Sequence, residues 1–413
     1  MKKKVPIRLA AIGLGNRTRK YLRYVASHPE EVTLSMIVET DDERRKEIQH
    51  KFNLPSRYCF SSTKDFFSKA RTIDAVIIGT PDDTHYDICL SAIDHGYHCL
   101  LEKPIAQTEK ECRAIKDAAS ARGVIICVCY VLRYHPFYIK LKEIISDGDL
   151  GPIISVNHIE NVGLDRMTHS YVRGIWGDSE ISCPIFLSKC CHDVDLLLWL
   201  TGKKPVRLYS FGSLNWFKKE NAPEGSAERC IDCQIETDCP FSAVDLYDRR
   251  RDWIDNFIVR KGEIIDDSIA RELKEGRFGR CVYHCDNNVV DHQTVALEMA
   301  DKTNVTITMC AFTRATTRIT KICCAYGEIL ADEQSITIEH FRRNRREFLN
   351  FSEIFNQPLH GNSDMYIVAD FIKAVSDPEN HTVRCSIDEA LESHVVCFKA
   401  EDSRLDGRMI DLA

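Results

Sequence analysis

The stretch IRLAAIGLGNRT, residues 7–18, decides the fold of this chain. An apolar strand runs into a turn that carries Gly13 and Gly15, and a helical pattern begins directly after them. In this context Gly13 allows the tight turn, and Gly15 lets the backbone approach a pyrophosphate at the helix N-terminus. Thr18 departs from the small third residue that such turns usually have. The stretch predicts a dinucleotide-binding turn, with a plain glycine-rich turn as the simpler alternative.

The surrounding pattern, over residues 1–130, alternates between strand and helix. Near-continuous apolar strands are predicted at 32–39, 73–81, 97–104 and 124–131, with a helical segment between each pair. Such strands belong in a parallel sheet that helices cover on both faces. We therefore expect residues 1–130 to form a doubly wound, Rossmann-type α/β domain that binds NAD.

From residue 131 the pattern changes to alternating polar and apolar positions. Strands of an antiparallel sheet are predicted at 152–163, 205–214, 288–300, 304–313 and 319–332. One helix, at 186–202, lies among them, and two more are expected near the C-terminus. We expect residues 131–413 to form a substrate-binding α+β domain on a large, mostly antiparallel open sheet, with a cysteine-rich insertion at about 218–245.

The composition excludes several classes of protein. The chain has 413 residues, enough for two domains, and 44% of them are hydrophobic. A formal net charge of −7 does not indicate the basic surface that binding to nucleic acid requires. No apolar run approaches the roughly 18 residues of a membrane span, and the N-terminal segment lacks the cleavage site of a signal peptide. We expect a cytoplasmic protein that binds neither nucleic acid nor membrane.

Glu39 ends the second predicted strand and bears on the choice of cofactor. A carboxylate at this position can accept both hydroxyls of an adenosine ribose, and it would repel a 2′-phosphate. The sequence therefore favours NAD over NADP. Arg44 and Arg45, on the next helix, keep the phosphorylated cofactor open as an alternative.

Two further strand ends are expected at the same edge of the sheet. Thr80 and Pro81 follow one strand, and His85 opens the next helix, where it either meets the cofactor or only caps and packs. Lys103 follows the other strand, directly after Glu102 and before a proline. Because ligands of open α/β sheets bind outside the carboxyl ends of the strands, these residues are candidates for the cofactor site.

Four motifs together resemble one known family. They are GLGNR at 13–17, GTPDDTH at 79–85, EKP at 102–104 and CCHDVDLLLWLTG at 190–202. This combination is similar to the glucose–fructose oxidoreductase/inositol dehydrogenase (Gfo/Idh/MocA) family over essentially the whole chain. The resemblance implies an NAD(P)-dependent oxidoreductase acting on CH–OH groups of a sugar, cyclitol or derivative, in carbohydrate metabolism. It also implies a homo-oligomer, a dimer or tetramer, formed through the C-terminal sheet.

The resemblance assigns two catalytic residues. Lys103 corresponds to the family lysine of the EKP motif, and His192 to the family's catalytic histidine. An imidazole is a base poised near neutral pH, and a lysine ammonium stabilises developing alkoxide charge. Many members carry an aspartate four residues before the histidine, where this chain has Ser188. Lys189 is a candidate to replace that polar function, or else it points to solvent.

Other residues are candidates to contact the cofactor or the substrate. The cofactor set is Gly13, Gly15, Asn16, Arg17, Glu39, Thr80, Pro81, His85, Glu102, Lys103 and Arg133. The substrate set is Tyr134, Arg173, Trp176, Asp195 and His292. A purely structural role is the alternative for the loop at 169–180, for Asp195 and for His292, whose strand neighbour Asp291 is expected on the opposite face.

One group of the 19 cysteines stands apart from the apolar segments. The motif CIDCQIETDC supplies Cys230, Cys233 and Cys239, and either Cys281 or Cys285 is a candidate for a fourth thiol. This pattern suits a closed tetrahedral zinc site, with Cys281 as the preferred fourth ligand. An iron–sulfur cluster and free thiols are the alternatives.

Two other functions stay open from the sequence. A redox-assisted glycosidase or lyase would hold NAD tightly and cleave a glycoside without net production of NADH. A non-enzymatic regulator would bind NAD without turnover. Ser188, in place of the aspartate, is the one sequence feature that points towards either.

Overall fold

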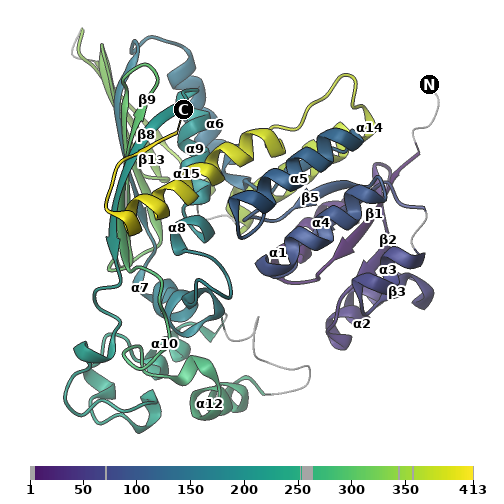
Figure 1. The fold of residues 1–413 in the computed structure, drawn as a ribbon, viewed down its shortest axis with the longest axis horizontal. Helices are drawn as coiled ribbons and strands as arrows, with labels where there is room; N and C mark the ends of the chain where they lie inside the picture. The colour runs from purple at the N-terminus through teal and green to yellow at the C-terminus, as the bar shows by residue number, and fades with distance from the viewer. Residues whose placement is uncertain are drawn as a thin grey trace. The chain divides into compact units, whose positions relative to one another are not determined.

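The chain forms two compact units. The computed structural model describes residues 5–69, 72–251, 253, 264–342, 345–355 and 358–412. The first unit comprises Met1–Asp149, Val194–Gly202 and Leu349–Phe398, and the second comprises Leu150–Asp193, Lys203–Phe348 and Lys399–Ala413. The chain therefore passes between the units several times, as its colouring from purple to yellow lets the reader follow (Figure 1).

The first unit is built on a six-stranded parallel sheet with the order β3-β2-β1-β4-β5-β6. Its strands are β1 (Ile7–Ile12), β2 (Val32–Val38), β3 (Cys59–Phe60), β4 (Ala75–Ile78), β5 (His98–Leu101) and β6 (Ile126–Val128). Every residue of β4 is fully buried, as expected for a central strand that helices cover on both faces. The predicted doubly wound fold is confirmed.

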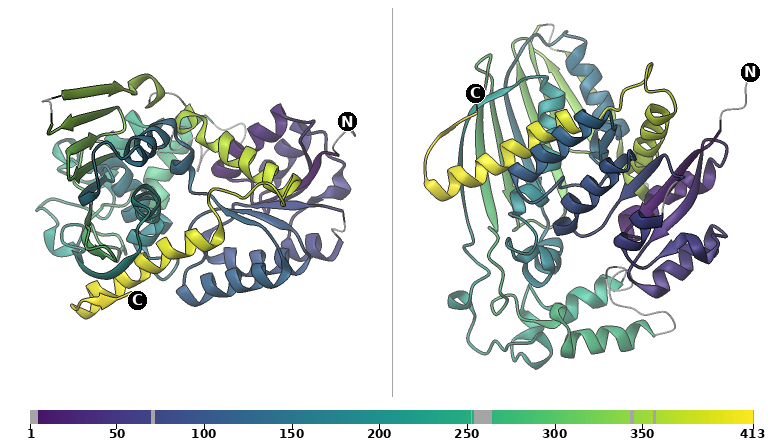
Figure 2. Two further views of the ribbon diagram at one scale, coloured as in Figure 1. Left: turned by 90° about the horizontal axis from the view of Figure 1, so that it is seen from above. Right: turned by 45° about the vertical axis from the view of Figure 1, so that its right-hand side comes forward.

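Helices lie on both sides of this sheet (Figure 2). The helices of the first unit include α1 (Asn16–Ser27), α2 (Asp42–Lys51), α3 (Thr63–Lys69), α4 (His85–Asp94), α5 (Glu109–Arg122), α6 (Pro136–Ser146), α13 (Ser352–Phe355), α14 (Pro358–Ser376) and most of α15 (Ile387–Asp406). Helix α1 packs against α14, and α4 packs against α5. Helix α5 begins with a capping box of Thr108 and Glu111 and ends at Gly123, whose φ of 64° suits the left-handed cap.

Residues 349–398 complete the first unit, although the sequence pattern groups them with the second domain. The N–H of Val128 donates to the carbonyl of Cys385 at 2.9 Å, and Cys127 forms an antiparallel bridge with Ser386. The edge of the parallel sheet at β6 is therefore covered by a segment that lies far along the chain from it.

The second unit is built on a nine-stranded sheet with the order β14-β13-β12-β11-β7-β10-β9-β8-β15. Its strands are β7 (Ile153–Asn161), β8 (Pro205–Ser213), β9 (His292–Met299), β10 (Asn304–Cys310), β11 (Thr317–Cys324), β12 (Gly327–Ala331), β13 (Ser335–His340), β14 (Arg345–Asn350) and β15 (Ile410–Asp411). Strands β7 and β10 run parallel, and the other described pairings are antiparallel. The prediction of a mostly antiparallel open sheet is confirmed.

Two predicted elements are wrong in detail. The helix expected at 186–202 is two helices, α8 (Ile185–Ser188) and α9 (Cys191–Thr201). The strand expected at 319–332 is a hairpin of β11 and β12. No glycine or proline interrupts residues 186–201, so the helix break carries none of the usual local signals.

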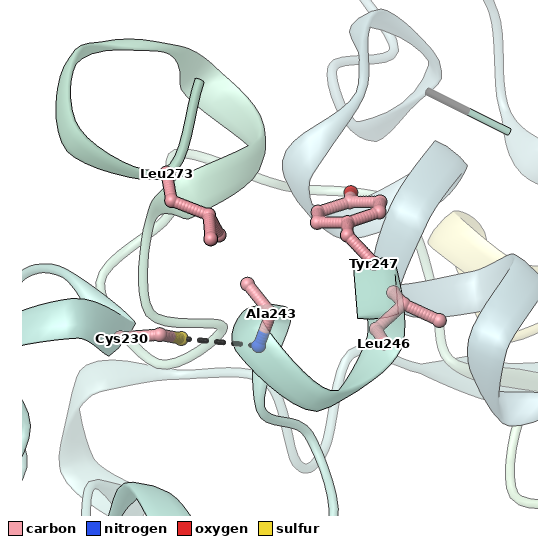
Figure 3. Close-up of a cluster of buried hydrophobic side chains, with 5 residues drawn as sticks. All are labelled: Cys230, Ala243, Leu246, Tyr247 and Leu273. Atoms are coloured by element: carbon pink, nitrogen blue, oxygen red, sulfur yellow. Dashed lines mark hydrogen bonds between the residues drawn. The ribbon is translucent and has the colours of Figure 1, made fainter. Parts of the chain in front are cut away.

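The cysteine-rich insertion folds beyond one end of the nine-stranded sheet (Figure 1). The described residues of this region, which extends beyond the predicted insertion, include the helices α10 (Ala243–Arg249) and α12 (Ile265–Glu275). A small apolar core of its own holds it together, formed by Cys230, Ala243, Leu246, Tyr247 and Leu273 (Figure 3). Within the described ranges, no helix has the length and apolarity to cross a membrane.

Candidate active site

The turn after β1 is as tight as the sequence predicts. Gly13 has a φ of 79°, and its N–H donates to the carbonyl of Val38 at 2.9 Å. A Cβ at this position would lie 2.7 Å from the carbonyl oxygen of Gly79 and 2.8 Å from the methyl group of Thr80. The turn therefore has no room for a side chain at Gly13, and Gly15 follows as the N-cap of α1.

Thr18 is accommodated by the strand that faces it. Its side chain is fully buried, and a Cβ built on Gly79 would lie only 2.2 Å from Thr18 Oγ1. Because Gly79 has no Cβ, the helix and the strand approach closely even though the helix carries a threonine. The small residue that permits this close approach is Gly79, directly after β4, and not residue 18 of the motif. The sequence pattern of the turn alone does not reveal this.

Glu39 joins the end of β2 to the glycine turn. Its carboxylate accepts the N–H of Leu14 at 2.7 Å and the N–H of Asp41 at 3.0 Å, and only 6% of the residue is exposed. A guanidinium nitrogen of Arg44 lies 3.8 Å from the same carboxylate. An acid therefore stands beside the dinucleotide turn, where a ribose would meet it.

Glu102 is the centre of a buried ionic network next to Lys103. Its carboxylate accepts hydrogen bonds from Tyr21 at 2.5 Å, from Arg17 at 2.9 Å and from the backbone N–H of Lys103 at 3.1 Å. Arg17 also pairs with Asp364 at 2.5 Å. Burial alone would raise the pKa of Glu102, but Arg17 and Lys103 outweigh it and lower the pKa below its usual value.

His85 connects the loops that follow β4 and β5. The bond between Lys103 and Pro104 is cis, and His85 Nδ1 lies 2.7 Å from the Pro104 carbonyl oxygen. Its Nε2 lies 3.0 Å from the carbonyl oxygen of Thr80. Both ring nitrogens of this fully buried histidine are therefore directed at backbone oxygens, which positions the Lys103 loop relative to Thr80.

His394 supports the same loop from helix α15. The N–H of Ile105 donates to His394 Nε2 at 2.9 Å, so Nδ1 carries the proton of the neutral ring and faces the carbonyl oxygen of Ala390 at 2.9 Å. The hydroxyl of Tyr130 also lies 2.9 Å from Nδ1. Burial lowers the pKa of His394 to about 4, and the charge of Lys103 acts in the same direction. Nothing in the local sequence around His394 indicates this role.

Three residues that were predicted to contact cofactor or substrate form hydrogen bonds or ion pairs with other residues of the first unit. Arg133 forms a bidentate pair with Asp195, with distances of 2.8 and 2.7 Å, and both side chains are buried. Burial raises the pKa of Asp195 to about 6, against the opposing effect of Arg133. The hydroxyl of Tyr134 donates to Asp370 at 2.6 Å. These contacts make Arg133, Asp195 and Tyr134 positioning residues in the described arrangement.

Lys189 belongs to a second ionic network, in the second unit. Its Nζ lies 2.8 Å from Glu160, whose other oxygen lies 3.0 Å from Arg318. Arg318 also pairs with Asp193 at 2.6 Å, and His158 Nε2 lies 3.1 Å from the same aspartate oxygen. Burial would raise the pKa of Asp193, but Arg318 and His158 outweigh it and lower the pKa. Lys189 is thus held by a carboxylate and does not simply point into solvent.

His192 is the second residue of α9 and immediately precedes Asp193 of this network. Ser188 ends α8, is buried, and donates to the carbonyl oxygen of Ile185 at 3.3 Å. The break between α8 and α9 removes the helical spacing by which Ser188 and His192 would share a face. Residues four apart share a face only on a continuous helix, and no continuous helix joins Ser188 to His192.

The inward face of β7 carries the acid that the sequence reasoning missed. Within β7, His158 and Glu160 are both buried and are two residues apart, so they share one face of the sheet. The sequence signal for this network was the pair His158 and Glu160, two polar residues at successive inward-facing positions of one strand. Their partners Arg318 and Lys189 are distant in sequence, so the network itself could not be read from the strand.

His292 lies on the opposite face of the same sheet. It pairs with Cys310, which in turn pairs with Asn161, the neighbour of Glu160 in β7. His292 is 47% exposed at its side chain, and its Nδ1 lies 2.7 Å from Asp291. With Trp216 and Phe312 among others, it lines an apolar cavity of about 1060 Å³. The structure therefore separates His292 from the face that carries Lys189.

Arg173 and Trp176 also have defined surroundings. Arg173 is fully buried and donates to the carbonyl oxygens of Arg280 at 2.7 Å and Phe241 at 2.6 Å. Trp176 is partly buried in the short turn Ile175–Gly177. The side chain of Arg173 is thus buried against Phe241 of the cysteine-rich insertion and against Arg280, and it does not lie on the surface.

The four cysteines of the zinc prediction come together. Cys230, Cys233, Cys239 and Cys281 all line one small cavity. In the described residues, however, no group of three or more His, Cys, Asp or Glu side chains is arranged to hold a metal ion. The structure therefore agrees with the prediction that these four cysteines are neighbours. It does not show the ligand geometry of a zinc site.

Comparison with known proteins identifies the family. Residues 7–130 match the oxidoreductase family domain described as an NAD-binding Rossmann fold, and residues 142–313 match the family's C-terminal alpha/beta domain. The chain belongs to the Gfo/Idh/MocA family. The two matches cover most of the chain and agree with the parallel and the antiparallel sheet described above.

Individual relatives are distant from this Gfo/Idh/MocA protein. It is 24% identical over 208 residues to the UDP-N-acetylglucosamine 3-dehydrogenase of Acidithiobacillus ferrooxidans, covering 50% of this chain and 58% of the relative. It is 30% identical over 146 residues to the scyllo-inositol 2-dehydrogenase (NAD(+)) of Bacillus subtilis, covering 34% and 39%. The matches thus span well under two thirds of these curated relatives.

A solved structure shares the whole fold. An oxidoreductase from Agrobacterium radiobacter, solved in complex with NAD+, L-tartaric acid and magnesium, superposes with a TM-score of 0.71 over 98% of both chains. The sequence identity is 14%, so this likeness establishes the fold alone.

The residues of this family member fit a nicotinamide dinucleotide. The turn at Gly13 has no space for a Cβ, and the acid Glu39 is hydrogen-bonded to the same turn. Thr80 and Lys103 follow β4 and β5, the strands next in order to β1, and so lie at the same edge of the sheet. Asn16 is exposed at the first position of α1, whereas Arg17 is engaged with Glu102 and Asp364.

Proposed function

We propose that the protein is an NAD-dependent oxidoreductase that transfers hydride between nicotinamide and a secondary hydroxyl or ketone of a sugar, cyclitol or derivative. One observation carries the proposal: Lys103 leaves β5 beside the buried, ionised Glu102, at the ligand-binding edge of the dinucleotide fold. Membership of the Gfo/Idh/MocA family supports it, as do the names of a sugar-nucleotide and an inositol dehydrogenase among the relatives.

The proposed roles follow from the chemistry of the side chains. Bound NAD would supply the hydride acceptor. The ammonium group of Lys103 stabilises negative charge on the reacting oxygen, or polarises the carbonyl in the reverse direction. His192 exchanges the hydroxyl proton, a task for which an imidazole needs little adjustment of its pKa. Lys189, positioned by Glu160, is the further cation proposed at the substrate.

The preference for NAD over NADP is proposed from Glu39. Its carboxylate is buried and held by two backbone N–H groups, so it has a fixed position from which to meet a ribose. A 2′-phosphate would bring a second negative charge to the same place. Arg44 lies 3.8 Å from the Glu39 carboxylate and is attracted to it, and Arg45 donates to the carbonyl oxygen of Glu39 at 2.6 Å.

Residues 1–130 are the proposed cofactor-binding domain and residues 131–413 the proposed domain for substrate binding and self-association. The outer face of the nine-stranded sheet supports the second role. Ile159 and Ile319 lie directly opposite each other on β7 and β11, and both are more than a third exposed. Ile154 and Leu330 add further exposed apolar surface on β7 and β12. We propose a dimer or tetramer formed through this face.

The oligomer is testable without knowledge of the substrate. The double variant Ile159→Glu/Ile319→Glu should lower the mass measured by light scattering to that of the monomer. Leu405→Glu changes an equally apolar, exposed residue on α15 and should leave the mass unchanged. A native protein that is already monomeric at micromolar concentration would contradict the proposal.

All nineteen cysteines are free thiols. Free thiols in this number fit a reducing compartment. We therefore propose a cytoplasmic location.

A panel of sugars and inositols, assayed with NAD+ and NADP+, tests the activity. We expect reduced nicotinamide to appear with at least one member, and Lys103→Ala or His192→Ala to lower kcat by about a hundredfold or more. Cofactor binding should survive both changes, and Lys110→Ala, an exposed lysine on α5, should keep full activity. Glycoside cleavage without net NADH, or cofactor binding without turnover on any substrate, would contradict the proposal and favour a redox-assisted hydrolase or a regulator.

A further inference from the structure

Two segments of the cysteine-rich insertion are held together by backbone contacts. Arg229 and Arg280 form an antiparallel bridge, and the N–H of Cys281 donates to the carbonyl oxygen of Glu228 at 2.9 Å. Cys230 and Cys281 therefore flank this bridge, each one residue beyond it on its own segment. The backbone thus places the CxxC segment next to a thiol that is distant from it in the sequence.

The four thiols share one small cavity. It has a volume of about 10 Å³, roughly that of one water-sized sphere, and its lining includes Cys230, Cys233, Cys239 and Cys281. Cys285 is not part of the lining, and its thiol lies 3.2 Å from the carbonyl oxygen of Cys281. The structure therefore distinguishes the two candidates for the fourth thiol and selects Cys281.

A buried cation faces this cluster. Arg173 is fully buried, one of its terminal nitrogens lies 3.6 Å from Cys230 Sγ, and the other makes no hydrogen bond. Among the described ion pairs, no carboxylate partners Arg173. A guanidinium stays protonated in proteins, and a buried charge requires a compensating charge of opposite sign. Cysteines that bind a metal ion do so as thiolates and would supply such a charge next to Arg173.

The sulfur of Cys230 faces two N–H donors. It accepts the backbone N–H of Ala243 at 3.4 Å (Figure 3) and lies within reach of Arg173. Sulfur ligands of metal sites commonly accept such hydrogen bonds, so both donors would remain in place around a bound metal ion.

We propose that Cys230, Cys233, Cys239 and Cys281 bind one structural zinc ion. Binding releases the four thiol protons to solvent and forms four Zn–S bonds, so the centre carries a net charge of −2 that Arg173 partly neutralises. Four protein ligands leave no open coordination position, so the site stabilises the fold of the insertion and takes no part in hydride transfer.

The side chains must turn towards the cavity for this site to form, since no metal-binding geometry exists among them as described. The Cys230 and Cys233 sulfurs lie 3.9 and 3.8 Å from the carbonyl oxygens of Arg280 and Gly225. Contacts of this length are weak, and a cysteine changes direction by rotation about a single side-chain torsion. The backbone needs no new connection, because all four residues already surround the cavity.

Elemental analysis of the full-length protein, purified without chelators or metal-affinity resin, tests the site. We expect about one zinc per chain in the native protein and in Cys285→Ser, and less than a tenth of that in Cys239→Ser. Cys285→Ser is the matched control because it removes a neighbouring thiol that does not line the cavity. Equal zinc in both variants, or no stoichiometric metal in the native protein, would overturn the proposal.

A second measurement decides the matter if Cys239→Ser does not fold. Treatment of the native protein with excess organomercurial should release about one zinc ion per chain, as read by a zinc-sensitive dye, and release of no zinc would overturn the proposal. Iron with acid-labile sulfide would instead identify an iron–sulfur cluster and overturn the zinc assignment. Loss of two mass units per disulfide on intact-mass analysis, without metal, would also overturn it.

Discussion

Arg17 in α1 and Asp364 in α14 form an ion pair of 2.5 Å across 347 residues of sequence. Asp364 is fully buried, and Arg17 also holds Glu102, the residue before Lys103. The C-terminal segment thus contributes a charge to the centre of the nucleotide-binding unit. Breaking this pair should disturb both the stability of the unit and the position of the Lys103 loop.

Asp364→Asn should lower the free energy of unfolding by about 1.5–3 kcal/mol, because it removes a charged hydrogen-bond partner of Arg17 at a fully buried position while Arg17 keeps its pair with Glu102. Chemical denaturation checks this. Glu47→Gln removes the partner of Arg19 in a pair that is exposed on both sides, and should cost about 0–1 kcal/mol. Similar losses in the two variants would show that the Asp364 pair is not buried in solution.

Gly79→Ala should destabilise the protein and weaken cofactor binding, because the added Cβ would meet Thr18 Oγ1 at 2.2 Å. Thr18→Ala removes a buried hydroxyl that has no hydrogen-bond partner and should by itself cost little. The double variant Thr18→Ala/Gly79→Ala should recover much of the stability lost in Gly79→Ala. Strictly additive effects in a thermal or chemical unfolding series would refute this account of the close approach.

Glu39→Gln should weaken the binding of NAD+ by roughly tenfold to a hundredfold, since a hydrogen bond to a charged group contributes about 1.5–3 kcal/mol. The amide oxygen can still accept the N–H of Leu14, so the fold should persist. Binding of NADP+ should improve relative to NAD+, because the repulsion of the 2′-phosphate disappears. Calorimetric titration with both cofactors measures the ratio, and an unchanged ratio would remove Glu39 from cofactor selection.

His394 should make the first unit sensitive to acid. Its folded pKa of about 4 lies below the value of about 6.5 expected in the unfolded chain. Between these values the unfolded chain binds the proton and the folded one does not, so stability falls as the pH drops from about 6.5 to 4, by up to about 3 kcal/mol.

His394→Gln should flatten this dependence of unfolding free energy on pH, whatever its effect at pH 7. His169, in the second unit, has its pKa lowered to about 3 by burial and acts in the same direction. The double variant His169→Gln/His394→Gln should therefore show the smallest slope. A slope in His394→Gln equal to that of the native protein would contradict the buried, neutral state of His394.

The parallel sheet could be predicted from the sequence because its signals are local. Five of its six described strands are near-continuous apolar runs, and the glycine turn at 13–15 has its helix directly after it; the two-residue edge strand β3 has no such signal and was not predicted. The edge at which Thr80 and Lys103 meet follows from the direction of parallel strands alone. The positions of Thr80 and Lys103 could therefore be predicted without knowledge of contacts between distant parts of the chain.

The interactions of the site residues could not be predicted, because their partners are distant in sequence. The segments around Arg133 and Asp195 give no sign of a partner for either charge, yet the two side chains form a buried ion pair. Lys189 depends on Glu160 from another strand. No glycine or proline marks the break before His192. Local sequence therefore could not predict it, because tertiary contacts override the helical propensity of residues 186–201.

The discontinuous first unit has a consequence for synthesis on the ribosome. The segment up to Asp149 emerges first, and the segment that begins at Leu349, which covers the sheet edge and supplies Asp364, is made only after most of the second unit. At about 5–20 residues per second, synthesis of the intervening chain takes roughly 10–40 s. During that time the nascent nucleotide-binding sheet has an open edge, and Arg17 has only Glu102 of its two carboxylate partners. The nascent unit is therefore a predicted client of ribosome-associated chaperones until the C-terminal helices arrive.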